Sequence, residues 1–105
     1  MGTIQKQHIL VVDDDQEIVR LMRGYLEQAG FAVQVAYDGA TATHILRREE
    51  IDLVILDLGL PDQDGWDITR MIRMDANLST LPIIMLTARL DPNDKLIGLE
   101  LGAHD

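Results

Sequence analysis

A chain of 105 residues with a formal net charge of −9 and no cysteine is long enough for one small domain. A mean hydropathy of +0.02 and the lack of any run near the roughly 20 apolar residues of a membrane helix argue against a membrane protein. The negative charge disfavours direct binding of nucleic acid and favours a cation or a basic protein surface as partner. Without a secretory signal or a cysteine, we expect a cytoplasmic protein.

The first half of the chain predicts two strands, each followed by a helix. The β-branched apolar runs 9–12 and 32–36 are typical of strands. Between them, apolar residues recur at helical spacing on one face before Gly30, namely Ile18, Leu21, Met22, Tyr25, Leu26 and Ala29. A second helix is predicted to start at Asp38 as its N-cap and to bury Ala42, Ile45 and Leu46.

The second half of the chain repeats this order. The runs 53–56 and 83–86 predict two further strands. A third helix is predicted to follow Gly65 and to bury Ile68, Met71 and Ile72. A fourth is predicted after Asp91-Pro92, with Leu96, Ile97, Leu99 and Leu101 as its apolar residues.

Alternating strands and helices predict parallel βαβ units with helices on both faces of one sheet. The runs 9–12 and 53–56 are almost wholly apolar, which is typical of central strands, whereas Gln34 suits an edge strand. We therefore predict an α/β fold, a flavodoxin-like doubly wound parallel sheet with strand order 2-1-3-4. In such sheets the functional site lies at the carboxyl ends of the strands.

Acidic residues directly follow the two predicted central strands. Asp13, Asp14 and Asp15 come after the first strand, and Asp57 comes after the third. At a shared edge, Asp13, Asp14 and Asp57 would lie close enough to repel by roughly 1 to 4 kcal/mol per pair. A divalent cation reverses the sign of that energy, and ligands that are all oxygen favour Mg²⁺. Asp15 is better explained as the cap of the next helix.

Thr87 ends the fourth predicted strand, where its hydroxyl would face the same crevice and could donate to a phosphoryl group on Asp57. The alternative is that Thr87 caps the following loop. The run 62–65 is similar to part of a calcium-binding loop, but Leu60 and Met71 stand where oxygen ligands would be required. The three histidines show no metal-ligand spacing.

Four motifs in this order resemble the receiver domain of two-component response regulators. They are ILVVDDD at 9–15, DLVILD at 52–57, LP with DG within 60–65, and PIIMLTA at 82–88, and they span nearly the whole chain. The stretch 98–105 resembles the subgroup that carries a C-terminal winged-helix DNA-binding domain.

By that resemblance, Asp57 accepts a phosphoryl group from the phosphohistidine of a sensor histidine kinase, and Thr87 is drawn inward to it. The resemblance implies that Asp57 and Asp14 bind Mg²⁺ directly. Asp13 would bind it through water, and Gly59 through its backbone carbonyl. The domain would act as a phosphorylation switch rather than a turnover enzyme. Its output, transcription in this subgroup, would contact DNA only through a separate output domain.

The resemblance also implies parts that would follow Asp105, namely an aromatic residue, a fifth strand with a lysine before a proline, and a fifth helix. We therefore expect residues 1–105 to form a receiver domain that is incomplete at its C-terminus, without that strand and helix. Such a chain should bind Mg²⁺ weakly and be phosphorylated poorly. The exposed edge of its fourth strand should favour a homodimer.

Two other functions fit parts of the pattern. A phosphohydrolase with Asp57 as nucleophile would usually carry a second acid two residues later, where this chain has Gly59. A domain that only mediates protein contacts would predict no signalling effect of Asp57→Asn, and the acids at the strand ends would then have no purpose.

Overall fold

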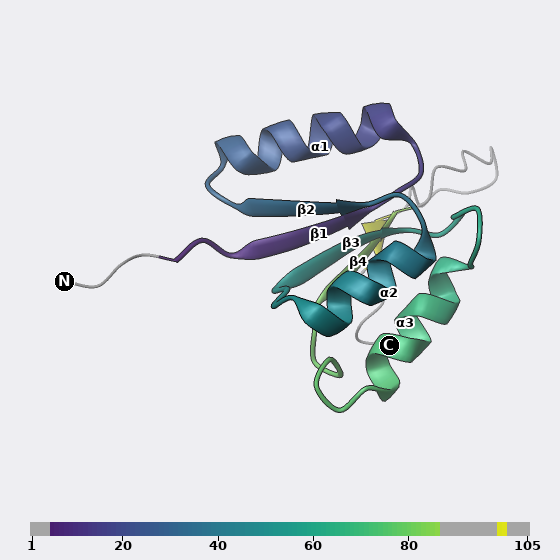
Figure 1. Ribbon diagram of the computed structural model, residues 1–105. Helices are drawn as coiled ribbons and strands as arrows, with labels where there is room; N and C mark the ends of the chain where they lie inside the picture. Colours follow the sequence, from purple (N-terminus) through teal and green to yellow (C-terminus); the bar gives the residue numbers. More distant parts are fainter. Residues whose placement is uncertain (1–4, 87–98, 101–105) are drawn as a thin grey trace.

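The computed structural model describes residues 5–86 and 99–100, which form one sheet with helices on both faces (Figure 1). In chain order the elements are β1 (His8–Val12), α1 (Gln16–Gln28), β2 (Ala32–Ala36), α2 (Gly39–Arg48), β3 (Leu53–Asp57), α3 (Gly65–Met74), β4 (Ile83–Leu86) and β5 (Leu99–Glu100). The order in the sheet is β2-β1-β3-β4-β5, and the first four strands are parallel. The predicted doubly wound sheet with strand order 2-1-3-4 is confirmed.

The register of the sheet brings the ends of β1 and β3 next to each other. Val12, the last residue of β1, lies opposite Leu56 on one side and Ala36 on the other. Asp57 extends β3 by one more residue and lies opposite Leu86 of β4. The edge position expected for the strand with Gln34 is confirmed, since β2 pairs only with β1 among the described strands.

Each face of the sheet has its own hydrophobic core. Helices α2 and α3 cover one face, and α1 lies on the other (Figure 1). The larger core contains Leu10, Val12, Ala36, Ala42, Leu46, Val54, Leu56, Leu60, Ile68, Ile72, Leu81, Ile83 and Met85. The smaller core contains Ile9, Val11, Val19 and Ile55. Because neighbouring residues of a strand point to opposite faces, central strands that are apolar throughout can line both cores.

Helix α1 has well-defined ends. The Asp15 side chain accepts hydrogen bonds from the backbone N–H groups of Glu17 and Ile18, so its predicted role as a cap is confirmed. At the other end Gly30 adopts a positive φ of 102°, and the Phe31 N–H donates to the carbonyl of Leu26 at 3.0 Å. This arrangement is a Schellman motif, in which glycine closes the helix without strain.

Helix α1 buries less of its apolar face than the helical spacing indicates. Val19 is buried, and Met22 and Leu26 are partly buried against the sheet. Leu21 and Tyr25 belong to the same apolar set in the sequence, yet they are 60% and 70% exposed. Among the described residues, no element packs over these two side chains.

Helices α2 and α3 begin at aspartates. Asp38 caps α2 and accepts a hydrogen bond from the Thr41 N–H at 2.7 Å, as predicted. Asp64 caps α3 and accepts from the Trp66 N–H at 3.0 Å, so that helix includes Gly65 instead of following it. Both caps satisfy N–H groups that have no partner within the helix.

The end of the described chain differs from the sequence-based expectation. The sequence predicted a helix through Leu99 and no fifth strand, but Leu99 and Glu100 pair antiparallel with Leu86 and Met85 of β4. The prediction is therefore wrong for these two residues. The reason is physical, because the outer edge of β4 offers backbone groups that a short extended segment can pair. The remainder of the predicted fourth helix lies outside the described residues.

No helix within the described ranges is both long enough and apolar enough to cross a lipid bilayer.

Candidate functional site

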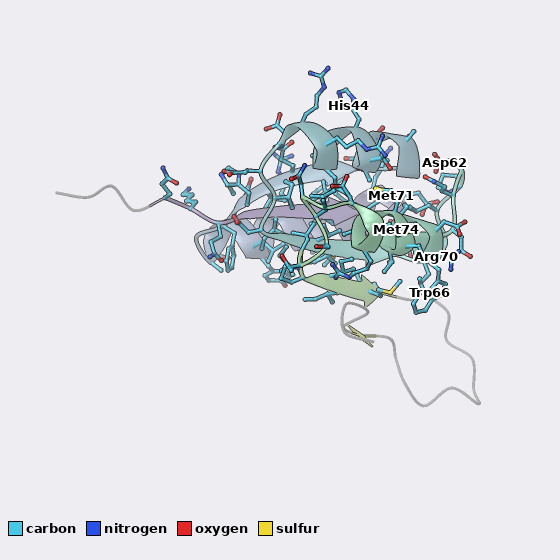
Figure 2. The ribbon with its side chains drawn as sticks, turned by 90° about the horizontal axis from the view of Figure 1, so that it is seen from below. His44, Asp62, Trp66, Arg70, Met71 and Met74 are labelled. Atoms are coloured by element: carbon cyan, nitrogen blue, oxygen red, sulfur yellow. The ribbon has the colours of Figure 1, made fainter. Side chains whose placement is uncertain are left out.

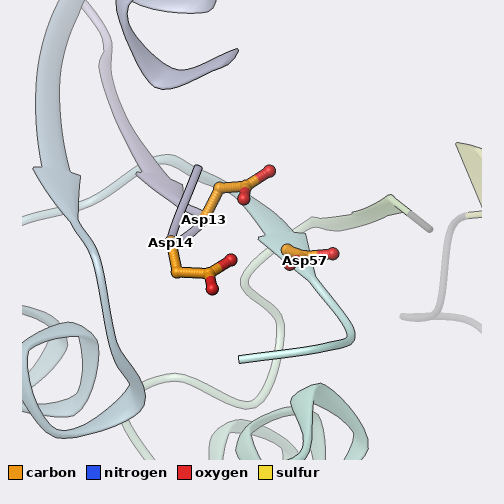
Figure 3. Close-up of side chains that lie close together, drawn as sticks. All are labelled: Asp13, Asp14 and Asp57. Carbon is orange, nitrogen blue, oxygen red and sulfur yellow. The ribbon is translucent and has the colours of Figure 1, made fainter. Parts of the chain in front are cut away.

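Three carboxylates meet at the carboxyl-end edge of the sheet. Asp13 and Asp14 directly follow β1, and Asp57 is the last residue of β3. One carboxylate oxygen of each lies within 4.8 Å of the others, and Figure 3 shows the three side chains side by side. Asp13 and Asp57 are only 6% and 7% exposed, whereas Asp14 is exposed. The structure thus brings together the three acids that the sequence singled out.

Backbone contacts hold Asp13 at this edge. Its N–H donates to the carbonyl of Ala36 at 3.1 Å, which ties the end of β1 to the end of β2. Its Oδ1 accepts a hydrogen bond from the Asp15 N–H at 2.9 Å. The backbone that leaves β1 therefore fixes the direction of the Asp13 carboxylate.

A close approach of α3 holds Asp57 in place. A Cβ atom added to Gly65 would lie 2.8 Å from the carbonyl oxygen of Asp57 and 2.9 Å from the Cα of Leu58. Both distances are shorter than real Cβ contacts, and the neighbouring atoms are backbone. Glycine at the start of α3 therefore allows that helix to pack directly against the end of β3.

The environment raises the pKa of two of the three carboxyls. Burial raises the pKa of Asp13, and the negative charges of Asp57 and Asp14 raise it further, against the lowering effect of the Asp15 N–H. Burial also raises the pKa of Asp57, as does the charge of Asp14, while the N–H groups of Gly59 and Leu58 lower it. The ionised form of both carboxyls is therefore destabilised, because they are removed from water and face other anions.

The donor set fits a hard divalent cation. Oxygens bound to one Mg²⁺ lie at most about 4.2 Å apart, twice the metal–oxygen distance of roughly 2.1 Å, and a bridging water extends that reach. The spread of 4.8 Å among the three carboxylate oxygens falls within this range once side chains rotate or water intervenes. The charges that raise the pKa values of Asp13 and Asp57 would attract such a cation.

A closed turn follows Asp57. The Leu58 N–H donates to Leu86 at 3.2 Å, and the Gly65 N–H donates to Leu58 at 3.0 Å. Gly59 and Asp64, the next residues inward along the turn, form an antiparallel bridge. These contacts close the base of the turn and leave the exposed Gly59 next to the Asp57 carboxylate.

The tip of this turn is held by the core and by α2. Leu60 is buried in the larger core. The Asp62 carboxylate accepts hydrogen bonds from the N–H of Gly39 at 2.7 Å and of Ala40 at 3.0 Å. In the sequence, Asp62 stands out only as part of a run similar to a calcium-binding loop, and nothing there predicts this contact. Its partners lie 23 and 22 residues away, beyond the reach of any local pattern.

Thr87, the fourth side chain predicted for the site, lies outside the described residues. Its neighbour Leu86 pairs with Asp57 in the sheet.

Comparisons with known proteins agree with this geometry. Residues 9–105 match the response regulator receiver domain family. The chain is 53% identical over 97 residues to the transcriptional regulatory protein GltR of Pseudomonas aeruginosa, covering 92% of this chain and 40% of that protein. It is 43% identical over 99 residues to the regulatory protein VanRc of Enterococcus gallinarum, covering 94% of this chain and 42% of that protein.

Solved structures give the same result. The chemotaxis response regulator CheY4 of Vibrio cholerae has a TM-score of 0.79 at 30% identity, over 87% of this chain and 76% of that one. The non-phosphorylated HemR receiver domain of Leptospira biflexa has a TM-score of 0.73 at 36% identity, over 82% of this chain and 68% of that one. The present chain thus spans about two fifths of the two regulatory relatives, and most of these solved chains.

Proposed function

Because this chain belongs to the response regulator receiver domain family, we propose that Asp57 accepts a phosphoryl group from the phosphohistidine of a sensor histidine kinase. One observation carries the assignment. Asp57 is 7% exposed, and its carboxyl has a raised pKa and lies within reach of Asp13 and Asp14 at the carboxyl-end edge of the sheet. That position suits a nucleophile that works next to a metal ion.

The same site would hold Mg²⁺ between Asp13, Asp14, Asp57 and the backbone carbonyl of Gly59. When bound, Mg²⁺ supplies neutralisation of the charge on the transferring phosphoryl oxygens. A carboxylate oxygen of Asp57 attacks phosphorus, and the P–O bond forms as the P–N bond to the donor imidazole breaks. The electron pair of that bond stays on the imidazole nitrogen. The chain's part is to hold Asp57 in line and largely out of water.

Phosphorylation would act as a switch. The acyl phosphate adds negative charge beside β4, and the hydroxyl of Thr87 would donate to it. The response is a shift between two states of the domain, and the chemistry of the domain is limited to its own phosphorylation and dephosphorylation. By analogy with the regulatory relatives, the output would be transcription through a separate DNA-binding domain, in the cytoplasm. The homodimer expected from an exposed edge of β4 stays a proposal, although β5 pairs with Met85 and Leu86 at that edge.

Treatment of the chain with acetyl phosphate and Mg²⁺ tests this function. We expect intact-mass analysis to show one added phosphoryl group on a small fraction of the chain, consistent with the poor phosphorylation expected of residues 1–105. Peptide mapping should assign it to Asp57, and we expect none without Mg²⁺. Asp57→Asn should abolish the adduct. Asp67→Asn is a matched control, since it removes one carboxylate from the exposed face of α3 and should leave phosphorylation unchanged. An adduct of the same yield on Asp57→Asn would refute the assignment.

A further inference from the structure

We infer that Asp62 is a positioning residue for the metal site. This inference rests on the proposed function, and it concerns how the turn after Asp57 is held. The turn spans residues 58–65 and includes Gly59, whose carbonyl is one of the proposed ligands. The Asp62 carboxylate joins the tip of that turn to the first turn of α2 and thereby fixes where the Gly59 peptide lies.

The contact between Asp62 and α2 uses both carboxylate oxygens. Oδ1 accepts from Gly39 at 2.7 Å, and Oδ2 accepts from Ala40 at 3.0 Å. These N–H groups belong to the first turn of the helix and have no partner within it. Hydrogen bonds to an ionised acceptor are stronger than neutral ones, and the helix dipole favours a negative charge at this end. Figure 2 shows Asp62 at one end of α2, with His44 farther along that helix.

Packing supports the same junction. A Cβ atom on Gly39 would lie 2.9 Å from the Cβ of Gln63, so the start of α2 rests directly on the turn. On the inner side, Leu60 is buried in the core beneath α2 and α3. The tip of the turn is thus held by one apolar side chain from inside and by one carboxylate from outside.

Gly59 is held by backbone contacts alone. It is exposed, has no side chain, and is linked to the turn through its bridge to Asp64 and to Asp57 through its N–H, which faces that carboxylate. A shift of the tip therefore passes directly to the Gly59 peptide. By contrast, Asp13 and Asp57 are held by the sheet itself. Loss of Asp62 should accordingly weaken metal binding without removing any of the three carboxylates.

Asp38 offers a matched control within the same helix. Like Asp62, it is an aspartate that accepts a hydrogen bond from the first turn of α2. Replacing either residue by alanine removes one negative charge and the hydrogen bonds that its carboxylate accepts from that helix end, two for Asp62 and one for Asp38. Only Asp62 lies on the turn that carries Gly59. A difference between the two variants therefore reports on the turn, and not on helix stability or on net charge.

The experiment is a calorimetric titration of the full chain with MgCl₂, comparing wild type, Asp62→Ala, Asp62→Asn and Asp38→Ala. We expect Asp62→Ala to weaken Mg²⁺ binding roughly tenfold, the low end for residues that hold a ligand in place. Asp38→Ala should stay within about twofold of wild type, because it leaves every residue around the metal in place. Asp62→Asn keeps one acceptor oxygen, so its Mg²⁺ affinity should lie between those of Asp62→Ala and Asp38→Ala. Hydrogen exchange of the Gly39 and Ala40 amides should accelerate in Asp62→Ala.

Each other outcome has a definite meaning. Equal losses of affinity in Asp62→Ala and Asp38→Ala would overturn the inference, since the effect would then come from the helix end in general. Wild-type affinity in Asp62→Ala would overturn it as well. If Asp62→Ala does not fold, Asp62→Asn decides by the same comparison with Asp38→Ala. A wild-type chain that binds no Mg²⁺ would instead refute the proposed function, and this inference with it.

Discussion

Two groups of aspartates lie at the same edge of the sheet, and their environments are opposite. The site aspartates, Asp13, Asp14 and Asp57, face one another. The capping aspartates, Asp38 and Asp62, face backbone N–H groups of α2. Hydrogen bonds from the backbone and side chain of Thr41 lower the pKa of Asp38, whereas burial raises the pKa of Asp13 and Asp57.

The comparison shows that the effect of a carboxylate on the stability of the fold depends on the groups that it faces. An anion that accepts hydrogen bonds at a helix start stabilises the fold. An anion buried beside other anions destabilises it until a cation arrives. The domain therefore keeps a local free-energy cost at the place where phosphoryl chemistry is proposed, whereas Asp38 and Asp62 face backbone donors instead.

The largest effect should come from closing the space between α3 and the site aspartates. Gly65→Ala places a Cβ against the backbone of Asp57 and Leu58, and should lower the free energy of unfolding by about 1 to 3 kcal/mol. Mg²⁺ binding should weaken as Asp57 is displaced. Urea unfolding and Mg²⁺ titration measure the two effects. Gly24→Ala is the control, because its Cβ would meet no atom within 4 Å and should stabilise α1 by about 0.5 to 1 kcal/mol.

A smaller effect of opposite sign is expected from removing one of the mutually repelling charges. Without metal, Asp57→Asn should raise the free energy of unfolding by about 1 kcal/mol, because the remaining acids lose a close like charge. Millimolar Mg²⁺ should stabilise the wild type and leave the variant unchanged, which reverses their order of thermal stability. Asp52→Asn makes the same change in net charge at the opposite end of β3, where its carboxylate accepts from the His8 N–H. A higher free energy of unfolding in Asp52→Asn would contradict the prediction.

The pH dependence should separate the two groups. Asp13 and Asp57 have pKa values raised above 3.8, so the folded chain binds more protons than the unfolded chain just above that pH. Their contribution to the free energy of unfolding should therefore fall as pH rises through this window. Asp38 has a lowered pKa, so its contribution is complete above 3.8 and is lost as pH falls through its folded value.

Denaturant unfolding between about pH 4 and about pH 7 measures this contrast in metal-free buffer. The difference in stability between Asp57→Asn and the wild type should widen with rising pH. A difference that stays constant across this range would show that the Asp57 carboxyl does not titrate differently in the folded chain.

The smallest effect should come from an acid that faces neither anions nor backbone donors. Glu27 pairs with Arg23 one helical turn earlier on α1, at 3.1 Å, and both side chains are about half exposed. Glu27→Gln should change the free energy of unfolding by no more than about 0.5 kcal/mol, because water and salt screen such a pair. Chemical unfolding at low and high salt checks this value.

Much of the fold was predictable because each strand and helix carries its own local pattern. Asp57 ends an apolar run, and Asp38 precedes a helical pattern, so both positions follow from residues within a few places of each. The meeting of Asp13 with Asp57 required only one further step, the strand order. That order followed from which strands were apolar throughout.

The remaining features depend on contacts that no local pattern encodes. The role of Asp62 requires the position of α2 relative to the turn, which arises only in the folded chain. The pairing of Leu99 with Leu86 depends on an available strand edge and overrides the helical spacing of the apolar residues around it. The exposure of Leu21 and Tyr25 shows that periodicity identifies an apolar face but not how much of it is covered.

The contact between Asp62 and α2 also has a consequence for the order of folding. It joins segments 23 residues apart, and we expect it to form after β3 has docked beside β1, because that docking brings the turn after Asp57 close to α2. Contacts that depend on such prior docking form late, so we expect Asp62 substitutions to speed unfolding while refolding keeps its rate. The turn after Asp57, which carries the proposed ligand Gly59, would then be the last part of the domain to form and the first to open, while the strands of the sheet remain paired.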